Sequence, residues 1–334
     1  MKRAAAAPPA PRRVVLETTY RCGLRCSFCY LAHAGRLGAG RAETGARRWL
    51  RFARTLPRGT EFFVTGGEPF VRGDCLALLA GLKRAGHRCG VNTNGTRLTG
   101  GLPERLAAAR PDYVLFSLHG LEPVHDRLSG RRGAFRLLLR AALRFARARR
   151  PGTELLLSCT VTPENAGSLS EVAALGRRLG VDRVLFEHLQ FMRPRRGGPE
   201  VLTARYPRPL AGAARLARSL RALARSEGGP RLEVRPALGP SALARWYGGE
   251  FPAKGGCRAP SDTLVVEPDG TARVCQNQTE RAGNVLEEGW KPVWRGSALE
   301  AFRRRAGRRL PPGCARCCQR FPLTPLAGGS RPCA

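Results

Sequence analysis

The chain has few of the features that mark a membrane or secreted protein. No apolar run approaches the roughly 20 residues that span a bilayer. The first segment, MKRAAAAPPAPRR, is positively charged but has only alanines and prolines where a signal peptide needs an apolar run. We therefore expect a disordered lead-in over residues 1–12 and a cytoplasmic protein. The 334 residues allow one barrel-sized domain and a smaller one.

Lysine is scarce, although the chain is strongly basic. Only four of the 58 Lys and Arg residues are lysines, and the arginines are spread through every segment. The net charge of +33 would by itself indicate a nucleic-acid partner. Scattered arginines with much Ala, Gly and Pro instead suggest a GC-rich coding background, and on helices they form solvated faces. We do not expect nucleic-acid binding, but the charge keeps it as an alternative.

The twelve cysteines argue for metal or redox chemistry in a reducing compartment. Cys22, Cys26 and Cys29 form a C-x3-C-x2-C array just after the apolar residues 14–16. Three neighbouring thiolates suit an iron–sulfur cluster that keeps one iron open to a small molecule. The alternatives are three unrelated thiols or a zinc site, for which His33 is the one nearby candidate for a fourth ligand.

Strands and helices alternate through the larger part of the chain. Periodicity predicts strands at 14–16, 61–64, 87–91, 113–118, 155–161 and 181–186, with helices between them. This order predicts parallel βαβ units, an open partial (βα)6 TIM-like barrel, and a site at the C-terminal ends of its strands. Polar motifs follow four of the strands: Thr65-Gly66-Gly67-Glu68-Pro69, Asn92-Thr93-Asn94-Gly95, Ser117-Leu118-His119-Gly120 and Glu187-His188.

The pattern changes in the C-terminal part. Residues 228–240 are rich in Gly and Pro and predict a linker. A turn at residues 268–271 between two short strands predicts a hairpin. We expect a core domain over 13–235 and a small domain of hairpin plus helix over 236–334. Its cysteines would suit zinc or iron–sulfur: Cys257, Cys275, Cys314 and Cys317.

Taken together and in this order, the motifs resemble the radical S-adenosylmethionine (radical SAM) superfamily over roughly residues 13–320. The resemblance implies that Cys22, Cys26 and Cys29 hold a [4Fe-4S] cluster whose open iron binds S-adenosylmethionine. Relatives usually have an arginine before the glycine at Ser129-Gly130, so the arginine that meets the cofactor stays unassigned. The other implied cofactor-binding positions are Phe28, Thr65, Gly66, Gly67, Glu68, Asn94 and Ser117.

The C-terminal cysteines are similar to the SPASM and twitch extensions of the same superfamily, which hold auxiliary iron–sulfur clusters. Residues 283–288 and Val293-Trp294 match the G-N-x-x-E and following tryptophan of those extensions. The likeness implies one auxiliary [4Fe-4S] cluster on the four cysteines, because Cys318 and Cys333 have the wrong spacing for more. The remaining cysteines are expected to be small buried apolar residues: Cys75, Cys89 and Cys159.

The resemblance also implies a reaction. A flavodoxin- or ferredoxin-type donor would reduce the first cluster, and S-adenosylmethionine would be cleaved to a 5′-deoxyadenosyl radical that removes a hydrogen atom from substrate. The auxiliary cluster would then accept an electron. We expect oxidative modification of a peptide or protein, with dehydrogenation of a small, sugar-like metabolite as the alternative. The candidate catalytic residues are His188, Glu187 and His119, whereas His125 could be structural.

Overall fold

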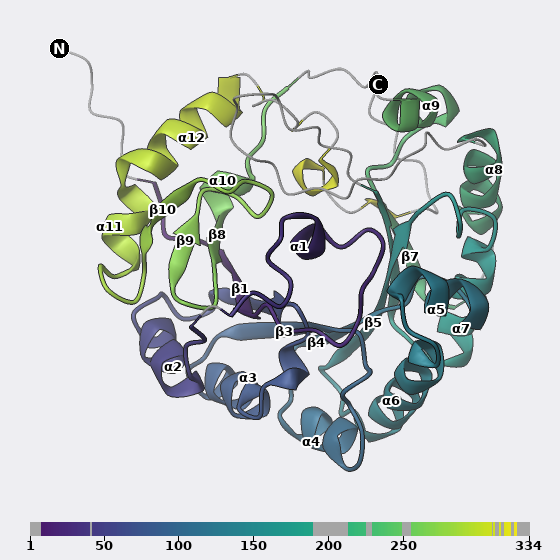
Figure 1. Cartoon of the computed structure of the whole chain (residues 1–334), viewed down its shortest axis with the longest axis horizontal. Helices are drawn as coiled ribbons and strands as arrows, with labels where there is room; N and C mark the ends of the chain where they lie inside the picture. Colours follow the sequence, from purple (N-terminus) through teal and green to yellow (C-terminus); the bar gives the residue numbers. More distant parts are fainter. Residues whose placement is uncertain are drawn as a thin grey trace.

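The computed structural model describes residues 8–40, 42–189, 213–224, 229–248, 255–308, 310, 314, 317–321 and 324–325. In these residues a curved sheet of eleven strands surrounds a central space, and helices surround the sheet (Figure 1). Six strands pair in chain order, all parallel: β1 (Arg13–Thr19), β2 (Glu61–Gly66), β3 (Arg88–Thr93), β4 (Tyr113–Ser117), β5 (Glu154–Val161) and β6 (Arg183–His188). The predicted partial barrel is confirmed.

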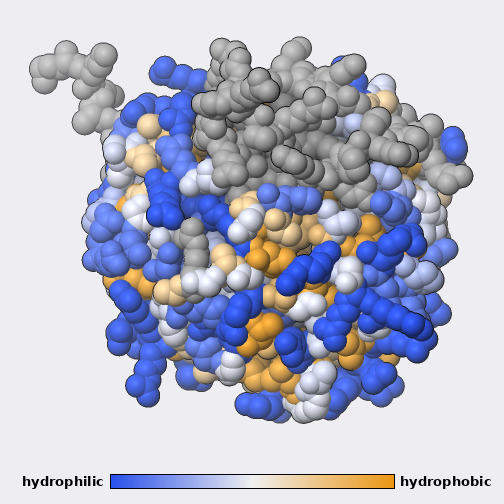
Figure 2. All heavy atoms as spheres, in the orientation of Figure 1, coloured by the Kyte–Doolittle hydropathy of each residue, from blue (hydrophilic) through white to orange (hydrophobic). Residues whose placement is uncertain are grey.

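Amphipathic helices cover the outer face of this sheet (Figure 1). They are α2 (Ala46–Arg54), α3 (Cys75–Arg84), α4 (Leu102–Ala108), α6 (Ala134–Ala148), α7 (Leu169–Arg178), α8 (Ala213–Ala224) and α9 (Pro240–Gly248). A short 3₁₀ helix, η1 (Pro69–Val71), follows β2. In α6, Leu138 and Phe145 are fully buried while Arg136 and Arg140 are exposed. The arginines of this helix therefore form the solvated face that the sequence predicted. Hydrophilic side chains likewise cover most of the described surface in Figure 2, with apolar ones grouped toward the middle of this face.

Two helices next to the first cysteine loop were not predicted. The short α1 (Tyr30–His33) begins directly after Cys29 and lies inside the ring of helices (Figure 1). The second, α5 (Glu122–Ser129), has Pro123 in its first turn and ends at Gly130, which has a left-handed φ of 66°. Proline at the start and glycine just past the end are the standard helix boundaries.

Side chains alternate across the barrel strands, so each strand serves two apolar layers. Val14, Phe62 and Phe116 pack outward against the helices in the main core. The inward-facing side chains form a separate cluster in the lumen: Tyr113, Leu115, Leu156 and Leu185, with Phe63 against them. These apolar side chains line the middle of the lumen, and polar inward-facing residues lie at the C-terminal strand ends.

Residues 228–240 are not simply a linker, so that prediction was wrong. They contain β7 (Arg231–Arg235), which pairs parallel to β6 and extends the barrel. The charged residues of this strand hid its pattern, but they have partners. Glu233 is 2% exposed and forms an ion pair of 3.3 Å with Arg183 on β6.

The predicted hairpin is confirmed as β8 (Thr263–Val266) and β9 (Thr271–Arg273). Strand β8 also pairs parallel to β1, and β11 (Thr324–Pro325) pairs with β7. The C-terminal part therefore joins both edges of the barrel sheet. Its other elements are α10 (Ala259–Asp262), β10 (Arg281–Asn284), α11 (Trp290–Arg295), α12 (Ser297–Arg308) and η3 (Cys318–Arg320). No helix in the described part of the chain is long and apolar enough to cross a membrane.

Candidate active site

A cavity of about 950 Å³ occupies the lumen and the C-terminal ends of the strands. All three cysteines of the first array line it, together with Cys275 and Cys318 from the C-terminal part. Most of the predicted site residues also line it: Phe28, Thr65, Gly66, Gly67, Asn94, Ser117, His119, Glu187 and His188. Motifs far apart in the sequence thus meet in one chamber, where α/β barrels place their sites.

The loop that carries Cys22, Cys26 and Cys29 is fastened by backbone hydrogen bonds. Arg25 N–H donates to the Ser129 carbonyl and Ser27 N–H to the Leu128 carbonyl, both over 2.9 Å. The end of α5 therefore holds the loop. This contact also explains Gly130, because a Cβ there would lie 2.7 Å from the Arg25 carbonyl oxygen.

These three thiols fit an iron–sulfur cluster. Burial raises their pKa values, and the pKa of Cys26 is raised further by the neighbouring thiols of Cys29 and Cys22. Bound iron would offset the free-energy cost of keeping these buried thiols ionised side by side, because thiolate is the form that binds iron. His33, the alternative zinc ligand, has its Nε2 atom 2.9 Å from the Ser27 carbonyl oxygen. No three His, Cys, Asp or Glu side chains among the described residues converge as ligands of a single metal ion.

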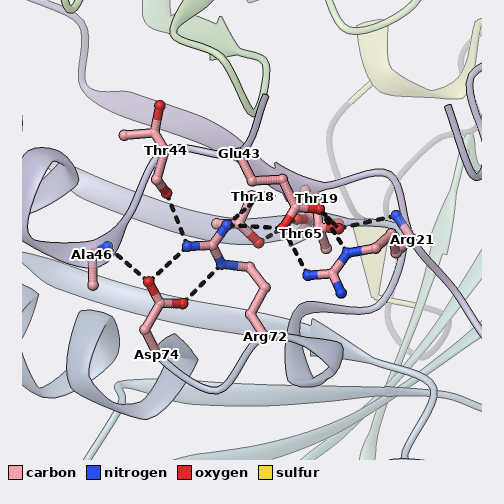
Figure 3. A network of polar contacts seen from close by, with 9 residues as sticks. All are labelled: Thr18, Thr19, Arg21, Glu43, Thr44, Ala46, Thr65, Arg72 and Asp74. Atoms are coloured by element: carbon pink, nitrogen blue, oxygen red, sulfur yellow. Dashed lines mark hydrogen bonds and ion pairs between the residues drawn. The ribbon is translucent and has the colours of Figure 1, made fainter. Parts of the chain in front are cut away.

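A polar network outside the barrel lumen fixes the entry to this loop (Figure 3). Arg72, with 6% of its side chain exposed, donates to the backbone carbonyls of Thr18 (3.1 Å) and Thr44 (2.9 Å) and pairs with Asp74 (2.7 Å). Glu43 lies 3.3 Å from Arg72 and accepts two hydrogen bonds from Arg21, the residue before Cys22. The network therefore joins the end of β1 to the segment after β2.

The two glycines after β2 are required by packing against the first loop. A Cβ on Gly66 would lie 2.4 Å from the Thr19 carbonyl oxygen, and one on Gly67 would lie 2.2 Å from that of Arg21. Gly66 also has a φ of +121°, which other residues rarely adopt. These glycines therefore allow a close approach to the backbone that leads into the cysteine loop.

Glu68 is fully buried and is not among the residues that line the cavity. Its carboxylate accepts hydrogen bonds from Asn94 N–H (2.7 Å), Phe70 N–H (3.1 Å) and the Thr93 hydroxyl (2.8 Å). Burial nevertheless raises its pKa to about 7. In this structure Glu68 joins the ends of β2 and β3, and its contact with the cofactor stays a prediction.

Asn94 and Ser117 line the cavity near the ends of β3 and β4. The amide of Asn94 donates to the Cys22 sulfur over 3.5 Å, and the Ser117 hydroxyl donates to Asn92 Oδ1 over 3.0 Å. A hydrogen bond to a ligand sulfur is one of the ways in which a protein tunes an iron–sulfur cluster. The amide side chain at position 94 thus reaches the first cysteine site directly.

His119 stands beside Phe28, with its ring edge-on at 4.7 Å. Its Nδ1 accepts the Thr160 N–H over 3.2 Å, which assigns the proton to Nε2. Burial lowers its pKa to about 3, so the imidazole is neutral. His125 is 0% exposed and accepts the His119 N–H over 3.2 Å, which supports a structural role for it.

His188 and Glu187 end β6 on another part of the cavity wall. The His188 Nδ1 atom lies 2.7 Å from the Tyr247 hydroxyl, and Glu187 forms an ion pair with Arg235 of β7. Burial lowers the pKa of His188 to about 3. Tyr247 and Arg235 were not predicted as site residues, because they lie in or after the stretch whose composition indicated a linker.

The four C-terminal cysteines also gather. Burial raises the pKa of Cys275, as do the thiols of Cys317, Cys257 and Cys314. Amides donate to two of the sulfurs, Asn277 to Cys317 over 3.1 Å and Gln278 to Cys314 over 3.6 Å. Four soft donors with N–H groups aimed at their sulfurs fit an iron–sulfur cluster.

The other cysteines have different surroundings. Cys75, Cys89 and Cys159 are at most 1% exposed and pack in the main core, as predicted. Cys318 is 1% exposed and lines the cavity. Cys333 lies outside the described residues.

Known proteins resemble this chain along its length. A Pre-heme d1 synthase from Dinoroseobacter shibae is 31% identical over 54% of this chain, which spans only 44% of that relative's length. A Mycofactocin maturase MftC from Mycobacterium ulcerans is 29% identical over 87% of this chain and 76% of its own. The crystal structure of Streptococcus suis SuiB bound to precursor peptide SuiA has a TM-score of 0.66 at 19% identity, over 87% of this chain and 66% of that one, which shows a shared fold.

Two family models match the two cysteine regions. The model described as "Radical SAM superfamily" matches residues 16–175, and the model described as "SPASM: Iron-sulfur cluster-binding domain" matches residues 257–318. These matches confirm the predicted cofactors, a [4Fe-4S] cluster with S-adenosylmethionine and auxiliary iron–sulfur. The chain belongs to the radical SAM superfamily and carries a SPASM iron–sulfur cluster-binding domain.

Proposed function

We propose that this protein oxidises a peptide or protein substrate by removing a hydrogen atom from it. The observation that carries the proposal is the shared cavity, which both Cys22–Cys26–Cys29 and Cys275 line. A substrate in the cavity would lie between the two cysteine sites. The names of the relatives support a peptide, because one is a maturase and the SuiB crystal structure contains a precursor peptide.

Cys22, Cys26 and Cys29 would hold the first cluster, and Cys257, Cys275, Cys314 and Cys317 the second. With S-adenosylmethionine bound, the first cluster supplies a 5′-deoxyadenosyl radical. The chain's own residues shape where that radical is used. The apolar lumen residues line the cavity below the site, and the His119 and Phe28 rings pack together beside the first loop.

The electron count favours a net two-electron oxidation. One electron enters from an external donor, and cleavage of S-adenosylmethionine consumes it. The substrate then loses a hydrogen atom, and to become an oxidised product it must lose a further electron and a proton. The C-terminal cysteines supply a site for the electron acceptor. His188 and Glu187, which line the cavity, are the candidate proton acceptors.

A small one-electron carrier of the flavodoxin or ferredoxin type would be the donor. The twelve cysteines favour a reducing cytoplasm. A division into a core over 13–235 and an auxiliary domain over 236–334 remains our proposal.

A tetrapyrrole substrate is the second candidate, because the Pre-heme d1 synthase relative is 31% identical over its matched region. Both candidates can be tested with reconstituted protein, S-adenosylmethionine and a chemical reductant under anaerobic conditions. Short peptides encoded beside the gene are supplied in one reaction and porphyrin precursors in another. We expect a peptide whose mass decreases by two hydrogen atoms or that gains a cross-link. Turnover of the porphyrin precursor or of a sugar alone would contradict the peptide assignment.

A further inference from the structure

A buried group of charged side chains joins the two cysteine-bearing parts of the chain. Glu17 on β1, Glu267 after β8 and Arg273 on β9 are all 0% exposed. Arg36, which follows α1, pairs with Glu267 and has 12% of its side chain exposed. We refer to these four residues as the buried charge cluster. Its two carboxylates and two guanidinium groups balance, so the group carries no net charge.

The first cysteine loop is attached to one end of this cluster. Tyr30, the residue after Cys29, donates its hydroxyl proton to Glu17 Oε1 over 2.9 Å. Tyr20, just before the loop, donates to the other oxygen of Glu17 over 3.0 Å. The backbone N–H of Arg36 donates to the Leu31 carbonyl in α1 over 2.8 Å. Glu17 therefore receives a hydrogen bond from each side of the loop.

The auxiliary cysteines are attached to the other end. Arg273 places Nη2 2.7 Å from Glu17 Oε1 and Nε 2.9 Å from Glu267 Oε1. Its remaining terminal nitrogen, Nη1, donates to the carbonyls of Gln276 (2.7 Å) and Gln278 (3.2 Å). Gln276 directly follows Cys275, so the turn beside this cysteine is held by the same guanidinium that holds Glu17.

We propose that Arg273 is a positioning residue that fixes the two cysteine sites relative to each other. It acts through Glu17 and Tyr30 on the first site and through the carbonyls of Gln276 and Gln278 on the second. The guanidinium is a rigid plane, and two hydrogen bonds from Nη1 and ion pairs at Nη2 and Nε hold it, so its partners cannot move independently. Leaving a buried carboxylate without its cation is strongly destabilising, which disfavours other arrangements.

The physical coupling does not depend on what the enzyme modifies. Only its consequence for turnover, a fixed geometry between the two sites, rests on the proposed function. The coupling can therefore be measured in iron-free protein without substrate. A protein that modifies no peptide could still show it, so failure of one proposal is distinguishable from failure of the other.

Hydrogen–deuterium exchange of the iron-free protein tests the coupling directly. Arg273→Met should speed exchange in residues 271–281 and also in residues 22–37. Tyr30→Phe removes a single oxygen atom from the first loop and should speed exchange in residues 271–281, because coupling is reciprocal. The small Tyr30→Phe change keeps the test valid if Arg273→Met does not fold. Unchanged exchange at the distant segment in Tyr30→Phe would overturn the proposal.

Arg303 on α12 offers a matched control in the same part of the chain. Its guanidinium donates to the carbonyls of Pro260 (3.0 Å) and Trp294 (2.8 Å), which lie in the C-terminal part. Arg303→Met removes comparable hydrogen bonds, and we expect unchanged exchange in residues 22–37. Faster exchange there in this variant would show general loosening and would contradict a specific role for Arg273.

A second experiment measures the reduction potential of the first cluster, which depends on the net charge of the buried charge cluster. In reconstituted protein, Arg273→Met leaves two buried carboxylates against one guanidinium, and the excess negative charge should lower the reduction potential of the first cluster. Adding Glu17→Gln removes one of those charges and should return the potential toward its original value. Arg273→Lys, which keeps the charge, should shift the potential less than Arg273→Met. A double variant that shifts the potential as far as Arg273→Met alone would leave only a general packing role and overturn the proposal.

Discussion

The side-chain amide of Asn277 lies 3.1 Å from the sulfur of Cys317 and is aimed at it as a donor. An N–H group directed at a ligand sulfur stabilises the more negative, reduced state of an iron–sulfur cluster. Asn277→Leu keeps the size of the side chain but removes the donor. We therefore expect the auxiliary cluster to have a lower reduction potential in this variant, measured by an anaerobic redox titration. Gln276→Leu, which changes a neighbouring amide that lines the cavity, is the control. An unchanged potential in Asn277→Leu would contradict this tuning role.

Glu68 predicts a pH dependence of stability. Burial raises its pKa to about 7 from an ordinary value of 4.5, so the folded state binds the proton more tightly than the unfolded state does. The free energy of unfolding should therefore fall as pH rises from 4.5 to 7, by roughly 3 kcal/mol from this group. Glu68→Gln should remove that fall in denaturant titrations of iron-free protein. Glu104→Gln, which alters an exposed ion pair with Arg144, should leave it in place. A wild-type slope that persists in Glu68→Gln would show that another group causes it.

The Tyr247 hydroxyl positions the imidazole of His188, a candidate catalytic residue. Tyr247→Phe leaves His188 Nδ1 without the partner now 2.7 Å away. Loss of one hydrogen bond of about 0.5–1.5 kcal/mol corresponds to a decrease in product formation of roughly two- to tenfold. Cleavage of S-adenosylmethionine should stay near the wild-type rate, because the pair lies away from the cysteine loop in sequence and is not among the predicted cofactor contacts. Equal losses in both rates would indicate a general structural effect instead.

The first cysteine array should be separable from the second. Replacing Cys22, Cys26 and Cys29 with alanine should lower the iron content of reconstituted protein from about eight per chain to about half. S-adenosylmethionine cleavage should be lost completely. Iron analysis and detection of 5′-deoxyadenosine measure the two effects. Cleavage retained by the triple variant would sink the assignment of these ligands.

Much of the fold could be predicted from the sequence, because local patterns determine it. Short, mostly apolar runs at 61–64 and 155–161 are typical of buried strands, and the helix over Ala134–Ala148 has a clear apolar stripe. Strand β7 was missed because its inward-facing charge, Glu233, is neutralised by Arg183 on another strand. Such a pairing is a tertiary interaction and leaves no local signal.

The candidate site, too, could be predicted only where its signals are local in the sequence. The close spacing of Cys22, Cys26 and Cys29 is a local signal, whereas Cys257, Cys275 and Cys314 lie far apart in sequence and were grouped by their likeness to SPASM and twitch extensions. The contacts of Glu68 with Asn94 and of Arg273 with Glu17 span long sequence separations and could not be predicted from either residue alone. The amides after Cys275 did carry a local signal: Gln276-Asn277-Gln278 is a run of side-chain donors next to a ligand. The partners of these donors, the Cys314 and Cys317 sulfurs, become evident only in the structure.

The central claim is that a substrate radical formed beside the first cysteine loop is oxidised by way of the second. The double variant Cys275→Ala, Cys317→Ala tests it most directly, with 5′-deoxyadenosine and oxidised peptide measured in the same anaerobic reaction. Our account predicts about half the iron, continued formation of 5′-deoxyadenosine and no oxidised peptide. A double variant that still makes the oxidised peptide, or zinc in place of iron at these cysteines in the native protein, would contradict it.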